Sequence, residues 1–79
     1  MKIKPLGRTS HERIFQNMTI FYSYSTPICI KFYGQTLVTS QYYSRTTTRH
    51  IRKYIQHEPN VEYVDQEIID NLIQTHTPY

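Results

Sequence analysis

A chain of 79 residues holds one domain, because a second hydrophobic core could not be built from so few residues. An aromatic content of 14%, which includes eight tyrosines, excludes a disordered chain, and a single cysteine excludes an internal disulfide. The net charge of +3 is unevenly distributed, since residues 1–57 hold all nine Lys and Arg with one acidic residue, Glu12, whereas residues 58–79 are acidic and hold no Lys or Arg.

Three strands are predicted in the first half of the chain, over about residues 18–40. Residues 18–24 place aromatic and β-branched side chains at every second position, and residues 28–33 alternate in the way expected of a strand with one buried face. A turn at Gly34 leads into a third short strand at residues 36–39, at hairpin distance. We therefore expect an antiparallel β-meander.

Two helices are predicted after the meander, over about residues 45–57 and 66–75. The first has apolar residues on one side and cations on the opposite side, and Ser44 or Thr46 can cap its N-terminus. The second carries one apolar stripe. The predicted fold class is therefore α+β, a three-stranded meander followed by two helices in a single domain of residues 1–79, with residues 1–10 and 76–79 flexible.

The most distinctive stretch surrounds the start of the first predicted helix. It combines hydroxyls, guanidiniums and an imidazole, and a helix N-terminus attracts anions through its free N–H groups and its dipole. The alternative is that Ser44 and Thr46 only cap the helix and the arginines are solvated. The candidate residues for binding a partner or an anion are Ser44, Arg45, Thr46, Arg49, His50, Arg52 and Lys53.

The cationic side of this helix has three interpretations. It could neutralise the phosphates of a nucleic acid, dock on an acidic protein, or remain a solvated surface that pairs with the acidic residues 58–79. The acidic segment could also mask the helix or form a second interface. Sequence patterns alone leave these alternatives open.

The tyrosines divide into two groups. Tyr22, Tyr24 and Tyr54 lie on apolar faces of their predicted elements, and we expect them in the core. Exposed rings on a sheet can stack on unpaired bases and are also favoured at protein interfaces. The candidate surface aromatics are Tyr33, Tyr42, Tyr43 and Tyr63.

Catalysis and metal binding find little support in the sequence. Cys29 lies between two isoleucines with no linked histidine, as an inert thiol would. His50 and His57 are seven residues apart, which is not the adjacent-turn spacing that binds one metal ion. We expect no enzymatic activity, no metal and no cofactor.

Two segments of the chain form distinctive blocks, Ser23-Tyr24-Ser25-Thr26-Pro27-Ile28 and Tyr43-Ser44-Arg45-Thr46-Thr47-Thr48-Arg49-His50. They resemble the Ser-Tyr-x-Thr and Tyr-Ser-x-Thr-Thr-x-Arg-His signature blocks of a family of small uncharacterised phage-encoded proteins, and the resemblance covers about residues 18–57. It implies a phage or prophage origin but no activity, cofactor or catalytic residue. Small proteins of such origin often act by occupying a site on host machinery, for example a CRISPR-type defence complex.

The predicted function is that of a non-enzymatic phage-type accessory protein, which binds and inhibits a host protein or ribonucleoprotein complex that handles nucleic acid or defends against phage. The alternative is a small nucleic-acid-binding module that contacts phosphates through the basic helix. A homodimer is compatible with either function. No apolar run is long enough for a signal peptide or a membrane span, so we expect the protein in the cytoplasm of the host cell.

Overall fold

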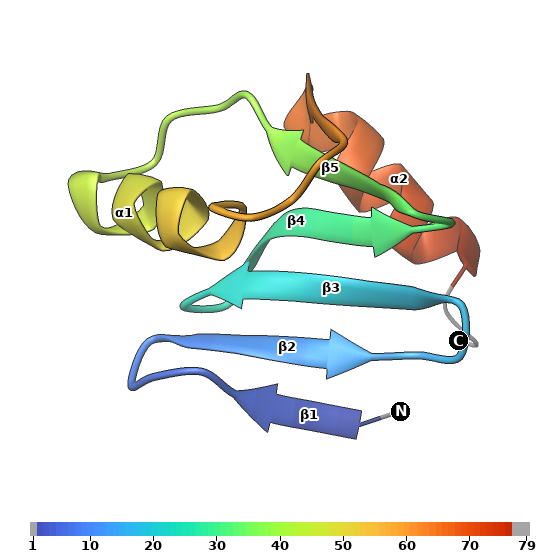
Figure 1. Cartoon of the computed structure of the whole chain (residues 1–79), viewed down its shortest axis with the longest axis horizontal. Coiled ribbons are helices and arrows are strands. Elements are labelled where there is room, and N and C mark those ends of the chain that lie inside the picture. Colours follow the sequence, from blue (N-terminus) through green and yellow to red (C-terminus); the bar gives the residue numbers. More distant parts are fainter. Residues whose placement is uncertain (1, 77–79) are drawn as a thin grey trace.

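The structure, a computed structural model, describes residues 2–76 and consists of one sheet with two helices (Figure 1). The helices are α1 (Arg45–Tyr54) and α2 (Gln66–His76). The strands in chain order are β1 (Lys2–Pro5), β2 (Ser10–Ile14), β3 (Met18–Ser23), β4 (Thr26–Phe32), β5 (Gln35–Thr39) and β6 (Val61–Val64).

The six strands form a mixed sheet in the order β1-β2-β3-β4-β5-β6. Strands β1 to β5 pair as successive antiparallel neighbours, and β6 then pairs with β5 in parallel. A parallel neighbour requires a crossover connection, which α1 supplies. The predicted three-stranded meander is therefore wrong as a fold: β3, β4 and β5 form a meander, but they are the centre of a sheet twice as wide.

The three missed strands lack the pattern that reveals a buried strand. All residues of β1 are exposed, and all residues of β2 are only half-buried, so pairing with a neighbour and not burial holds these strands. Strand β6 has only four residues and lies at the other edge of the sheet. The flexibility expected of residues 1–10 stays a prediction, although Lys2–Pro5 are paired into β1, and residues 77–79 lie outside the described part of the chain.

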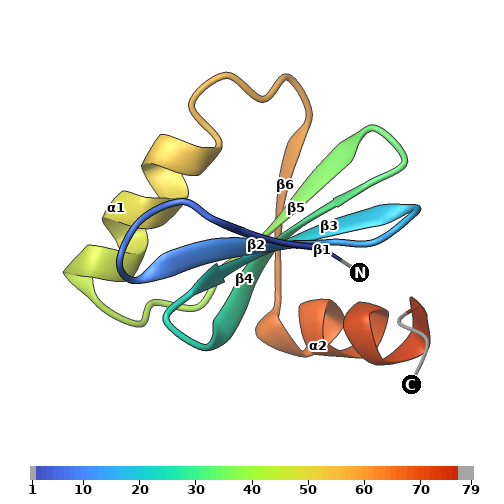
Figure 2. The ribbon, with the colours of Figure 1, turned by 90° about the horizontal axis from the view of Figure 1, so that it is seen from below.

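The two helices pack on opposite faces of the sheet, as the view from the edge of the sheet shows (Figure 2). Helix α2 buries Ile69 completely, against a cluster that contains Met18, Ile20 and Ile30. Helix α1 buries Ile51 against a second cluster on the other face. The helices start where the sequence predicts them, and α1 ends at Tyr54, three residues before the predicted end.

A β-bulge places two consecutive residues of β4 in the same core cluster. The pairing between β3 and β4 shifts register between Phe21 and Tyr22. As a result, the consecutive residues Ile28 and Cys29 both belong to the cluster beneath α1, whereas strict alternation would send them to opposite faces. Burial raises the pKa of the Cys29 thiol to about 12, outweighing the opposing effect of the Lys31 ammonium. This thiol is therefore protonated and enclosed in the core.

Candidate anion-binding face

Helix α1 begins with a hydroxyl cap. The backbone N–H of Thr47 donates to Ser44 Oγ over 3.1 Å, and the Ser44 hydroxyl donates to Thr47 Oγ1 over 3.2 Å. The Thr48 hydroxyl donates to the Ser44 carbonyl oxygen. Ser44 therefore serves the helix as its N-cap, in line with the capping alternative for this residue.

Behind the cap, the inner side of α1 joins the end of β3 through a polar junction. Ser23 Oγ lies 2.8 Å from His50 Nδ1 and 3.0 Å from Thr47 Oγ1. His50 Nε2 lies 3.3 Å from Thr9 Oγ1, just before β2. The two sequence blocks, far apart in the chain, therefore meet at Ser23, Thr47 and His50.

A serine beside a histidine is also the pairing of a nucleophile with its base. Here, however, Ser23 is only 1% exposed, so a substrate has no access to its hydroxyl. The other ring nitrogen of His50 faces a threonine hydroxyl where a hydrolase would place an orienting carboxylate. In this conformation the junction connects α1 to the sheet and encloses the Ser23 hydroxyl.

The outer side of α1 carries a shallow groove of about 290 Å³, which we call the arginine groove. Its helical residues follow the spacing i, i+3, i+4 and i+7, so they share one side of the helix. Arginine supplies planar, bidentate donors for phosphate or carboxylate oxygens. The residues of the arginine groove are Tyr42, Arg45, Thr48, Arg49 and Arg52.

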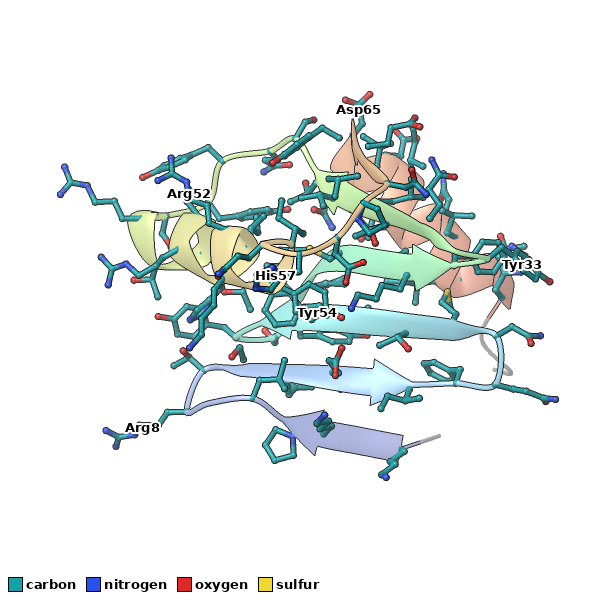
Figure 3. All side chains as sticks on the ribbon, viewed as in Figure 1. Arg8, Tyr33, Arg52, Tyr54, His57 and Asp65 are labelled. Carbon is teal, nitrogen blue, oxygen red and sulfur yellow. The ribbon has the colours of Figure 1, made fainter. Side chains whose placement is uncertain are left out.

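A second hollow, the turn pocket, lies between α1 and the connection from β1 to β2 and has a volume of about 450 Å³. Lys53 and His50 contribute from the helix, and Arg8 and Thr9 from the connection. Figure 3 shows Arg8 and Arg52 toward the same end of the molecule. The structure thus divides the predicted site, because His50 and Lys53 line a different hollow from the three arginines, while Ser44 is the cap and Thr46 is an exposed residue of α1.

The two acidic residues on the α1 face, Glu12 and Glu58, already interact with other side chains. The Tyr54 hydroxyl donates to Glu12, and both burial and this hydrogen bond raise the pKa of Tyr54. Glu58 forms an ion pair with Lys31 at 2.6 Å, and the Lys31 ammonium lies 4.6 Å from the centre of the Tyr54 ring. Neither carboxylate forms an ion pair with a cation of α1.

The remaining acidic residues lie on β6 and α2, or between them, and α2 packs on the opposite face of the sheet (Figure 2). Within residues 2–76, no carboxylate lies within ion-pair distance of Arg45, Arg49, Arg52 or Lys53. Internal pairing of the basic helix with the acidic segment is therefore not what the structure shows. These remaining acidic residues are Glu62, Asp65, Glu67 and Asp70.

The tyrosines follow the predicted division with one exception. Tyr22 is buried, and Tyr54 is half-buried with its ring stacked on Phe21 at 3.9 Å. Tyr24 is wrongly predicted as core, because it occupies the turn between β3 and β4 with a φ of 58° and is 53% exposed. The four candidate surface aromatics Tyr33, Tyr42, Tyr43 and Tyr63 are exposed.

Some residues that line these two hollows were not predicted as site residues from the sequence, among them Arg8, Thr9 and Thr48. Thr48 carried a usable signal, because it lies three residues after Arg45 and four before Arg52 on the same side of the helix. The sequence gives no such signal for Arg8 and Thr9, because their approach to α1 depends on the pairing of β1 with β2 and of β2 with β3.

On the α2 face of the sheet, His11 provides a pH-dependent contribution to stability. Its ring stacks on Tyr22 at 4.8 Å, and partial burial together with the nearby Arg13 guanidinium lowers its pKa below the ordinary 6.5. The unfolded chain then binds more protons than the folded chain just below pH 6.5, so stability falls as the pH drops through this range. We expect the pH dependence of the urea midpoint between pH 7 and pH 5 to be weaker in His11→Phe, and an unchanged slope would contradict this role.

Taken together, these features define a small α+β domain with one helix on each face of a mixed sheet. On one side, α1 carries cations that form no ion pair with any carboxylate of residues 2–76. The chain belongs to DUF8033, a family of unknown function that matches residues 1–71. No curated protein and no solved structure matches the chain. Among the helices formed by residues 2–76, none has the length and apolar character needed to cross a membrane.

Proposed function

We propose that the protein is a non-enzymatic, phage-type accessory protein that binds and inhibits a host macromolecular complex in the host cytoplasm, docking through the arginine groove. The observation that carries this proposal is the separation of charge between the two faces. Arg45, Arg49 and Arg52 line one hollow, and no carboxylate of residues 2–76 lies within ion-pair distance of them. The two carboxylates on the α1 face, Glu12 and Glu58, have other partners, and the remaining ones lie on or between β6 and α2. An anionic partner could therefore approach α1 without repulsion from the protein's own acidic residues.

The context of the proposal comes from the resemblance to small phage-encoded proteins. The junction of Ser23, Thr47 and His50 supports it, because both blocks contribute to the contact that fixes α1 on the sheet. Rigid elements hold binding residues more reproducibly than loops do. The blocks would accordingly present the arginines on a helix of fixed position, and a complex that handles nucleic acid offers the anionic surface that such a helix recognises.

Affinity capture from a phage-host lysate tests the proposal. The tagged full chain is compared with a variant carrying Arg45→Ala, Arg49→Ala and Arg52→Ala, each with and without nuclease, and recovered proteins are identified by mass spectrometry. We expect one complex to be enriched by the native chain in both arms and lost with the variant, since contacts with the complex itself do not depend on nucleic acid that the nuclease can reach. Equal recovery with both proteins, or no enrichment after nuclease, would overturn the proposal.

A further inference from the structure

We propose that the anion received by the arginine groove is a single strand of nucleic acid, with phosphates on the three arginines and an unpaired base on Tyr42. This inference rests on the proposed function and names the chemistry of the surface that the protein contacts. It is drawn from the composition of the groove, which is lined by three guanidiniums, one hydroxyl and one aromatic ring.

The arginines form a ladder along the helix axis. At about 1.5 Å per residue, Arg45 and Arg49 are about 6 Å apart along the axis, and Arg49 and Arg52 are about 4.5 Å apart. Long guanidinium side chains can adapt this spacing to successive phosphates of a flexible strand. Thr48 lies between the arginines and adds a hydroxyl that can bond a phosphate oxygen.

Tyr42 distinguishes a strand from other anions. Its side chain is 69% exposed, and it lies three residues before Arg45, at the end of the ladder. Burying this ring against a partner would remove apolar surface from water, and a carboxylate offers no such surface. An unpaired base does, because every base has a π-face on which an aromatic side chain can stack.

A single strand also fits better than a duplex. The bases of a duplex are paired and stacked, so their faces are closed to Tyr42, and only the phosphates would reach the groove. A partner protein with an acidic surface would engage the arginines but would need a separate apolar side chain to cover Tyr42, whereas a single strand carries a phosphate and a base in every nucleotide. The groove therefore favours a strand whose bases are free to turn outward.

Fluorescence anisotropy with labelled oligonucleotides tests the inference on the full chain. The probes are a single strand of about ten nucleotides as DNA and as RNA, a duplex of the same length, and inorganic polyphosphate as a polyanion without bases. We expect the single strands to bind more tightly than the duplex or polyphosphate. Three phosphate contacts predict a slope of log K against log salt of about −2, from about −0.7 for each contact on a single strand.

Two substitutions separate stacking from charge. Tyr42→Ala should weaken single-strand binding about 10-fold and leave duplex and polyphosphate binding unchanged, whereas Tyr42→Phe should retain the native affinity. Tyr63→Ala is the matched control, because Tyr63 is exposed on β6 and is no part of the groove. Arg49→Ala should weaken all probes and reduce the salt slope by about 0.7.

The outcomes distinguish this inference from the proposed function. If no single strand binds at low salt, or if binding is equal for the duplex and insensitive to Tyr42→Ala, the single-strand inference is wrong. Arginine-dependent capture of a host complex would in that case still support the proposed function. If single strands bind as expected but no complex is captured, the proposed function is wrong and the inference stands.

Discussion

Reversal of three charges, by Arg45→Glu, Arg49→Glu and Arg52→Glu together, is expected to lower the affinity for the captured complex by more than about 100-fold. Each arginine can form charge-assisted hydrogen bonds to an anionic partner, and reversal replaces this attraction with repulsion. The variant should remain folded, because all three side chains are exposed and only the outer side of α1 changes. A negative side chain at Arg45 also suits the first turn of the helix.

The matched control reverses the same number of charges at the start of the other helix and within it, by Asp65→Lys, Glu67→Lys and Asp70→Lys. These residues are exposed and lie at or within α2 on the far face of the sheet. We expect this variant to bind at least as well as the native chain, because none of these residues lines the groove and the net charge becomes more positive, including near Tyr43, whose pKa is raised by burial and by Asp70. Far-ultraviolet circular dichroism checks both folds. A loss of binding in the α2 variant equal to that in the α1 variant would contradict the assignment of the binding face.

The largest effect on stability is expected from Ile69→Ala, which should lower the free energy of unfolding by about 2–5 kcal/mol. Ile69 is the one fully buried residue among those described in α2, and it packs against Met18, Ile20 and Ile30. Truncation removes this contact and leaves a cavity that the sheet cannot fill. The free energy of unfolding of a native protein is only about 5–15 kcal/mol, so this loss is a large fraction of the total stability.

Urea unfolding followed by circular dichroism measures this loss. Its control is Ile68→Ala, a substitution of the same type at the neighbouring position, where the side chain is 44% exposed. We expect the control to shift the urea midpoint only slightly. Similar midpoints for the two variants would mean that α2 does not depend on Ile69 for its packing.

The packing of Ile69 on the sheet determines how masking of α1 by the acidic segment can be tested. Removal of residues 60–79 would delete β6 and α2 along with the negative charges, and would open the cluster on one face of the sheet. Masking of α1 by this segment is therefore better tested by charge reversal than by truncation.

The strands at the centre of the sheet and the two helices could be predicted because their sequences carry a strong local pattern of apolar residues. The apolar, β-branched residues Ile28 and Ile30 revealed β4, but the single buried face expected from their alternation was wrong, because the bulge places Ile28 with Cys29 on the face opposite to Ile30. The apolar stripe through Ile69 and Leu72 revealed α2. Strands β1 and β6 have no such pattern, because β1 is an exposed strand held by its hairpin pairing with β2, and β6 is a short strand held by long-range pairing with β5. Local periodicity cannot report contacts made across the sheet.

The candidate site was predicted in composition but not in arrangement. The spacing of Arg45, Arg49 and Arg52 is enough to place them on one side of a helix. The inward position of His50 follows from its contacts with Ser23 and Thr9, which lie 27 and 41 residues away in sequence. Tyr24 was predicted as core because it continues the alternation of β3, but the chain turns there with a positive φ and exposes the ring.

The central claim, that the arginine groove is the binding face, is tested most directly by nuclear magnetic resonance. The full chain labelled with nitrogen-15 is titrated with inorganic polyphosphate, which carries the shared anionic chemistry without bases, and amide shifts are mapped along the sequence. We predict the largest shifts at residues 42–52 and none above background in α2. Shifts centred on Arg8 and Lys53, or spread evenly over all exposed lysines and arginines, would contradict the claim.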